Sequence, residues 1–168
     1  AKDAADASFN RISIDGDRST NDSFFVLASG ASGVSIANPD VAKAFAAALG
    51  EVSADLARAV VEDGEGATKF VEIRVTGATR TADAKRVAEH VATSVLVKTA
   101  IFGKDPNWGR IIARIGDAGP ALQIPKIEIR INKTPVVKGG RGLAPPSELR
   151  SLLNPKNISI EIMLGQGA

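Results

Sequence analysis

The chain has 168 residues, 21 basic and 19 acidic side chains, and no cysteine. This length predicts one domain over residues 1–168, standing alone or as a subunit. Because the charges nearly balance and are interleaved, nucleic acid is not an expected partner, and no apolar run approaches the ~18 residues needed to cross a membrane. Disulfides and thiolate chemistry are excluded, and a single histidine, His90, makes a histidine-based metal site or Ser-His-Asp triad hard to build.

The first residues, "AKDAADAS", are rich in alanine and charge, which is typical of the last turns of a helix whose start is missing. No signal peptide opens the sequence, because a basic region followed by an apolar core is absent. The chain stops at "IMLGQGA", directly after an apolar strand pattern. We therefore expect a trimmed or processed polypeptide.

The next segment predicts a β-hairpin. Residues 9–15 alternate in strand fashion, Asp15-Gly16 is a favoured turn dipeptide, and "NDSFFVLASG", residues 21–30, supplies a continuous apolar run. A run of that kind indicates a strand buried on both faces.

Two helical segments and one strand follow. Asn38 and Pro39 suit the cap and first position of one long or two short helices that end near Gly64. Residues 70–76 alternate as a half-exposed strand. Thr81 is the expected cap of the helix that follows this strand.

The last third of the sequence predicts a hairpin around Asn132-Lys133, a short helix from Pro146 and a final strand over residues 157–164. Hairpins and separate helices predict an α+β fold, layered, with a mainly antiparallel sheet.

The stretch "FGKDPNWGR" contains the only tryptophan of the chain, Trp108. Asp105 is the expected cap and Pro106 the first residue of a helix whose free N–H groups, beside Gly109, could receive an anionic ligand. The alternative, which we favour, is that Trp108 packs as an anchor under the loop and donates its indole N–H to a carbonyl.

The stretch "EDGEGATKF" places Glu62, Asp63 and Glu65 beside two glycines. Glycine lets a backbone approach a ligand closely, and a carboxylate held there could bind a substrate ammonium group. The alternative is an ordinary helix end with solvated acids, although acids are unfavourable at that end of a helix. The sequence leaves both interpretations open.

The acidic stretch "DGDRSTND" superficially resembles a calcium loop, but it lacks the closing glutamate of that motif, so a hydrogen-bonded turn is the better interpretation. His90 falls in the middle of a helix and is expected to be a surface or half-buried side chain. No self-contained nucleophile and base are evident in the chain.

Three stretches, "SFNRISIDGDRSTND", "EDGEGATKF" and "VKTAIFGKDPNWGRIIARIG", together resemble the β chain of the glutamate N-acetyltransferase/ornithine acetyltransferase family of arginine biosynthesis. The later "KIEIRINKTPVVKGGRG" and "ISIEIMLGQG" are similar to that family too, so the resemblance covers essentially the whole chain. Arg18 is a departure, since relatives usually carry threonine there. It puts the hydrogen bonding of that turn in doubt, though not the family.

This resemblance implies acetyl transfer from N-acetylornithine to L-glutamate through an acyl-threonine intermediate, with acetyl-CoA as an alternative donor and no metal or other cofactor. The nucleophile is the first residue of the family β chain, which corresponds to a position upstream of Ala1. The resemblance places a substrate contact on Glu65, with Glu62 as a weaker candidate, and leaves Trp108 as a packed anchor.

The resemblance further implies an α chain cut from the same precursor, assembly to α2β2, helices on the outer faces of an αββα-like stack, and a cytoplasmic location, or an organellar one in a eukaryote. The rival hypotheses are a related self-processing acyltransferase or hydrolase with another acyl donor, and a non-catalytic structural fragment.

Overall fold

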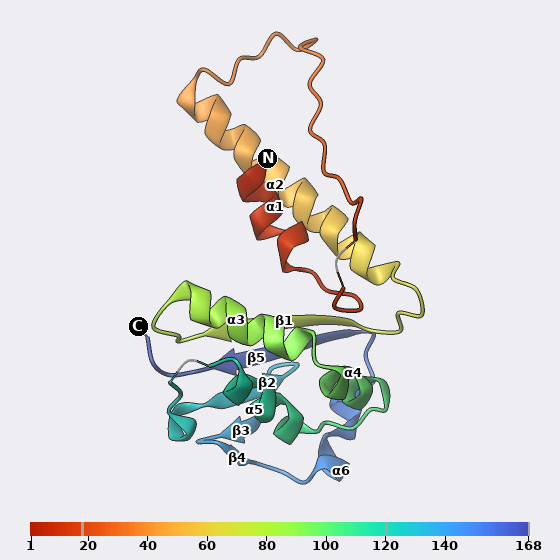
Figure 1. Cartoon of the computed structure of the whole chain (residues 1–168), viewed down its shortest axis with the longest axis vertical. Helices are drawn as coiled ribbons and strands as arrows, with labels where there is room; N and C mark the ends of the chain where they lie inside the picture. Colours follow the sequence, from red (N-terminus) through yellow and green to blue (C-terminus); the bar gives the residue numbers. More distant parts are fainter. Residues whose placement is uncertain (18, 120, 168) are drawn as a thin grey trace. The chain divides into compact units, whose positions relative to one another are not determined.

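The computed structural model describes residues 1–17, 19–119 and 121–167, and Figure 1 shows their helices and strands. The chain divides into two compact units, which are unit 1 over Ala1–Glu65 and unit 2 over Gly66–Ala168. The expectation of a single domain over residues 1–168 stays a prediction.

Unit 1 is helical. The α1 helix spans Lys2–Ala7, as the alanine-rich start predicts, the 3-10 turn η1 spans Phe9–Arg11, and α2 spans Pro39–Glu62. The Asn38 side chain caps α2 by accepting from the Asp40 N–H at 2.9 Å, and Pro39 occupies the first turn, as expected. Gly50 does not interrupt α2, which is therefore one long helix.

The predicted hairpin over residues 9–29 is wrong. Residues 9–11 form a 3-10 turn, and none of the described residues from 12 to 38 belongs to a strand. The apolar run that predicted a buried strand is instead exposed, with Phe25 at 77% and Leu27 at 92% of full exposure. A lone two-stranded hairpin is marginal in water, and the described residues of unit 1 include no further strand to pair with this segment.

Unit 2 contains a five-stranded sheet in the order β1-β5-β2-β3-β4. Its strands are β1 (Phe70–Thr76), β2 (Glu128–Ile131), β3 (Thr134–Lys138), β4 (Arg141–Gly142) and β5 (Asn157–Met163). Only the β1–β5 pair is parallel, so the prediction of an α+β fold with a mainly antiparallel sheet is confirmed.

The β2–β3 hairpin turns at Asn132 and Lys133, as predicted. Both residues have positive φ, 48° and 68°, which is the left-handed conformation that a tight hairpin turn requires. The Asn132 side chain also accepts a 2.8 Å hydrogen bond from the Ser159 N–H, which ties this turn to β5.

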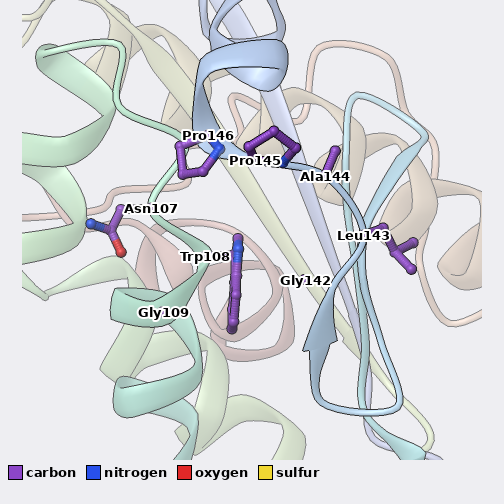
Figure 2. A pocket seen from close by; sticks show the side chains of 8 residues that line it. All are labelled: Asn107, Trp108, Gly109, Gly142, Leu143, Ala144, Pro145 and Pro146. Carbon is purple, nitrogen blue, oxygen red and sulfur yellow. The ribbon is translucent and has the colours of Figure 1, made fainter.

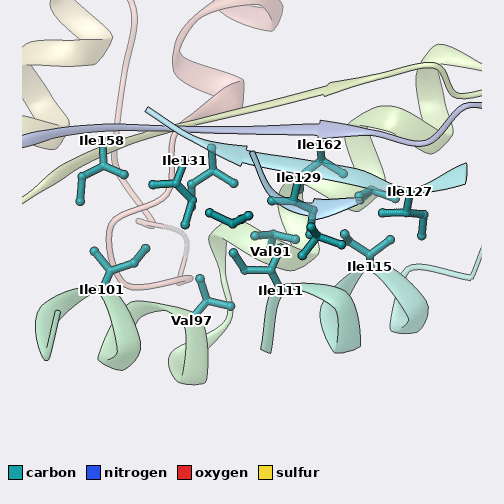
Figure 3. Close-up of a cluster of buried hydrophobic side chains, with 14 of the residues drawn as sticks. Val91, Val97, Ile101, Ile111, Ile115, Ile127, Ile129, Ile131, Ile158 and Ile162 are labelled. Atoms are coloured by element: carbon teal, nitrogen blue, oxygen red, sulfur yellow. The ribbon is translucent and has the colours of Figure 1, made fainter. Parts of the chain in front are cut away.

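The helical elements of unit 2 are α3 (Thr81–Ala92), α4 (Val95–Phe102), α5 (Trp108–Asp117), η2 (Ile124–Lys126), α6 (Pro146–Leu149) and η3 (Arg150–Leu153). The core lies between the sheet and these helices (Figure 3). Alternate residues of β2 and β5 point into it, and Ile129, Ile160 and Ile162 are fully buried. Burying one such side chain contributes about 1.5–3 kcal/mol.

Two predicted helix caps are wrong. Thr81 is the first residue of α3 and Arg80 is its cap, and the Arg80 side chain is bonded to Asp83 one turn into the helix. Asn107, not Asp105, caps α5, since its side-chain oxygen accepts from the Arg110 N–H.

Within the described ranges, none of the helices combines the length and apolar character that crossing a bilayer demands.

Candidate functional site

The loop after α2 carries the predicted substrate contact. Asp63 ends α2 by donating its N–H to the Ala59 carbonyl oxygen at 3.0 Å. Gly66 has φ +70°, a conformation that strongly favours glycine. At Gly64 an added Cβ would lie 3.1 Å from the Ile14 side chain. Local structure therefore explains why glycine occupies both positions.

The two candidate carboxylates of this loop differ in their partners. Glu62, the last residue of α2, accepts a 2.8 Å hydrogen bond from the Arg58 Nε one turn earlier. Glu65 is exposed and has no hydrogen bond or ion pair among the described residues. A carboxylate without a protein partner retains both oxygens for an incoming ammonium or guanidinium donor. Glu65 is therefore the better-placed ligand, and its role stays a prediction.

Lys69 fixes the other end of the loop, and the sequence reasoning missed it. Its ammonium donates to the carbonyl oxygens of Leu153, Asn154 and Pro155 at 2.9, 2.8 and 2.9 Å. These carbonyls lie at the end of η3, where backbone acceptors lack helical partners and attract a cation. The only signal in the sequence was a lysine directly before a predicted strand. That signal does not identify the carbonyl oxygens that accept hydrogen bonds from the ammonium.

Trp108 lines an open pocket of about 560 Å³ in unit 2 (Figure 2). The other lining residues are Asn107, Gly109, Gly142, Leu143, Ala144, Pro145 and Pro146. The Trp108 side chain packs against the hydrophobic core, as the anchor interpretation predicts. The expected hydrogen bond from its indole N–H to a carbonyl is not found among the described residues.

Gly142 explains how the indole fits. A Cβ at this position would lie 2.6 Å from Cζ2 and 2.8 Å from Nε1 of Trp108, far inside van der Waals contact. The ring therefore lies flat against the β4 backbone. At the start of α5 the Asn107 side chain already occupies the N–H of Arg110, which removes one of the donors that an anionic ligand would use.

Two further predictions concern residues outside this pocket. His90 is half-buried near the end of α3, as expected, and its backbone carbonyl accepts from the Arg114 Nε at 3.2 Å. The acidic stretch is a hydrogen-bonded turn, as predicted, in which the Asp17 N–H donates to Asp15 at 2.9 Å and the Thr20 hydroxyl donates to Asn21 at 3.0 Å. Arg18, the departure from the family pattern, lies outside the described residues.

The motifs and fold match known proteins. The ArgJ family model matches residues 1–168. The arginine biosynthesis bifunctional protein ArgJ of Geobacter sulfurreducens is 44% identical over 98% of this chain and 43% of its own length. The mitochondrial ArgJ of Coprinopsis cinerea is 55% identical over 67% of this chain and 25% of its own length. This chain thus spans less than half the length of these curated relatives.

A crystal structure of ArgJ from Bacillus halodurans superimposes with a TM-score of 0.89 at 38% sequence identity, covering 99% of this chain and 80% of that chain. Sequence and fold agree over nearly every residue, and this chain therefore belongs to the ArgJ family.

Proposed function

We propose that this chain is the β chain of an acetyltransferase that moves an acetyl group from N-acetylornithine to L-glutamate in arginine biosynthesis. The observation that carries the proposal is the family match over residues 1–168, including the loop that presents Glu65 without a protein partner. Relatives that share this match are named for arginine biosynthesis.

The reaction proceeds in two acetyl transfers, first to a threonine of the enzyme and then to glutamate. A threonine hydroxyl at the start of the mature β chain, upstream of Ala1, attacks the acetyl carbonyl of N-acetylornithine while its own α-amino group takes the proton. The amide C–N bond breaks, and ornithine leaves with that proton. The glutamate amine then attacks the acyl-threonine ester, which releases N-acetylglutamate and restores the hydroxyl.

In this scheme Glu65 binds the ammonium group of N-acetylornithine, the substrate whose KM is measured in the test below. A charge-assisted hydrogen bond between a carboxylate and an ammonium is about twice as strong as one between neutral groups. The side chain therefore orients the substrate and performs no proton transfer itself. Neither a metal nor another cofactor takes part.

A second acetyl donor is part of the proposal because the relatives are called bifunctional. Acetyl-CoA would acylate the same threonine, and glutamate would then take the acetyl group. Two other hypotheses make different predictions. A self-processing acyltransferase or hydrolase would use another acyl donor. A non-catalytic fragment would show no turnover.

The partner of this chain is the α chain of the same precursor, and αβ units pair to α2β2 in an αββα-like stack. In support, this chain covers 80% of the Bacillus halodurans chain but only 42% of the Nitratidesulfovibrio vulgaris relative. The crystallised chain is thus much shorter than the curated sequences, as a two-chain protein requires. The expected location is the cytoplasm, or a mitochondrion for a eukaryotic source, as in the name of the Coprinopsis relative.

The test is to express the complete precursor with Glu65→Gln, which keeps size and removes the charge. We expect the KM for N-acetylornithine to rise by about tenfold or more, because a charged hydrogen bond contributes about 1.5–3 kcal/mol. Glu51→Gln, on an exposed face of α2, is the matched control and should behave as wild type. Unchanged KM and kcat in Glu65→Gln would remove this residue from the substrate site.

Activity with N-acetylornithine, acetyl-CoA and a panel of other N-acyl amino acids decides among the functions. Transfer to glutamate from N-acetylornithine supports the proposal, and preference for another N-acyl amino acid as donor contradicts it.

A further inference from the structure

Unit 1 has almost no hydrophobic core of its own. Among the described residues of unit 1, the only buried hydrophobic side chains are those of Ala4 and Ala57. The remaining buried apolar residues belong to unit 2. A stable fold needs packed layers around an apolar core, so unit 1 is incomplete as it stands.

The first uncovered surface is a row of apolar side chains on α2, here called the α2 stripe, formed by Phe45, Val52, Leu56 and Val60. Their exposed fractions are 47%, 55%, 51% and 46%. Spacings of seven, four and four residues place them on one side of the helix. The α1 helix contacts α2, and the buried α2 residues Ser53 and Ala57 lie on the flank next to the α2 stripe. The four stripe side chains remain about half exposed.

The second uncovered surface is the extended segment 22–29, here called the arm, which Figure 1 shows without helix or strand. Its apolar run presents Phe25 and Leu27, the two most exposed large hydrophobic residues of the described chain. Its backbone takes part in no strand ladder. An extended segment with free N–H and C=O groups and apolar side chains is a template for pairing with the edge of another sheet.

The arm is tethered to the rest of unit 1. The Phe24 and Phe9 rings are in tilted contact at a centroid separation of 5.2 Å, which holds one end of the arm next to η1. The chain downstream of the arm leads to Asn38, the capped start of α2. The Phe9–Phe24 contact holds one end of the arm, which lowers the entropy that the arm loses when it pairs with a partner.

We propose that the arm and the α2 stripe dock onto the complementary chain of the same precursor, with the arm adding a strand to a sheet of that chain and the α2 stripe packing on its apolar surface. The occupant follows from length, because more than half of each curated relative lies outside the part that matches this chain. The chain crystallised from Bacillus halodurans has the same fold over 99% of this chain, so it includes unit 1.

We expect an interface of this kind to be obligate, because it supplies the apolar core that the described part of unit 1 lacks. This inference rests on the two-chain organisation in the proposed function, and it adds the surfaces that join the chains. It does not depend on which acyl donor the enzyme uses.

The experiment co-expresses this chain with the rest of its precursor and measures assembly by native mass and amide hydrogen exchange. We expect a stable complex in which the amides of residues 24–28 exchange at least about tenfold more slowly than in the chain alone, since a ladder hydrogen bond protects an amide until it opens. Acetyl transfer is recorded separately.

Two variants address the two surfaces. Leu27→Lys in the arm and Leu56→Glu in the α2 stripe should each weaken the complex by about tenfold or more, because each places an unpaired charge in an apolar interface. Phe102→Glu on α4 is the control, since Phe102 is 72% exposed but belongs to neither surface. It should leave assembly unchanged.

Three outcomes would overturn the inference: no complex with the wild-type chain, a complex in which residues 24–28 exchange freely, or protection that arises from self-association of this chain. Normal assembly with protected arm amides but no acetyl transfer would instead contradict the proposed function and leave the docking surfaces intact.

Discussion

Lys69 and Pro155 lie 86 positions apart in the chain, and the Lys69 ammonium donates a 2.9 Å hydrogen bond to the Pro155 carbonyl oxygen. Two more carbonyls of the same turn accept from this ammonium. The next residue, Phe70, donates its N–H to the Lys156 carbonyl oxygen at 2.9 Å and begins the parallel pairing of β1 with β5. Lys69 thus holds the start of β1 at the turn that precedes β5.

Replacing Lys69 by methionine keeps the length of the side chain and removes the donors. We expect a loss of about 1–3 kcal/mol of stability, because three backbone acceptors lose a charged partner. Urea unfolding gives this value, and hydrogen exchange should show faster opening of the β1 amides. Lys156→Met is the control, since Lys156 is exposed and its side chain has no hydrogen bond among the described residues. Equal stability of the two variants would contradict the tether.

Gly142→Ala tests the contact between β4 and the indole. The added Cβ would collide with Trp108, so the ring must move or the strand must shift, at a cost of about 1–3 kcal/mol. Trp108 is the single tryptophan, and its fluorescence therefore reports the displacement directly. Urea unfolding followed at its emission maximum gives both the stability and the change in environment.

Gly116→Ala serves as the counterpart in α5. A Cβ added at Gly116 would meet no heavy atom within 4 Å, and alanine is the better helix former, so this variant should gain about 0.5–1 kcal/mol. If Gly142→Ala were as stable as Gly116→Ala, the tight packing of the indole on β4 would be wrong.

Asp83 gives unit 2 a defined pH dependence. Arg80 donates hydrogen bonds of 2.8 and 2.9 Å to its carboxylate, which lowers the pKa of Asp83 below its ordinary value, and the charge of Arg86 acts in the same direction against the opposing effect of burial. A carboxyl whose pKa is lowered by folding stabilises the native state above its unfolded pKa. That contribution disappears as the pH falls through the lowered folded value.

We therefore expect wild type to exceed Asp83→Asn in Tm at neutral pH, and the gap to close in the acid range below the ordinary pKa of aspartate. Thermal unfolding at a series of pH values measures this gap. Asp55→Asn, on the exposed side of α2, should show no comparable closing of the gap. A gap that stays constant from neutral to acid pH would contradict the role of the Arg80–Asp83 pair.

Local sequence signals predicted most of unit 2. The alternation in β1 and β5, the turn at Asn132 and the start of α6 at Pro146 depend on neighbours within a few residues, and each appears as predicted. The caps were less predictable, because Asn107 and Asp105 are both good capping residues and their neighbours decide between them.

The sequence could not predict the state of the arm. Its apolar pattern is that of a buried strand, but a strand needs a neighbouring strand to pair with, and none lies among the described residues of unit 1. The three acceptors of Lys69 were also beyond reach, because they lie more than 80 positions away. The loop pattern around Glu65 identified a candidate carboxylate, while its lack of a partner became clear only from the contacts of Glu62 with Arg58.

The position of β5 has a consequence for biosynthesis of the protein. This strand lies between β1 and β2, so β1 has no neighbouring strand until residues 157–163 have left the ribosome. The β2–β3 hairpin can form earlier, since its partners are close in sequence. During translation β1 therefore stays unpaired while about eighty further residues are synthesised. In that period its apolar side chains are open to aggregation and to binding by chaperones.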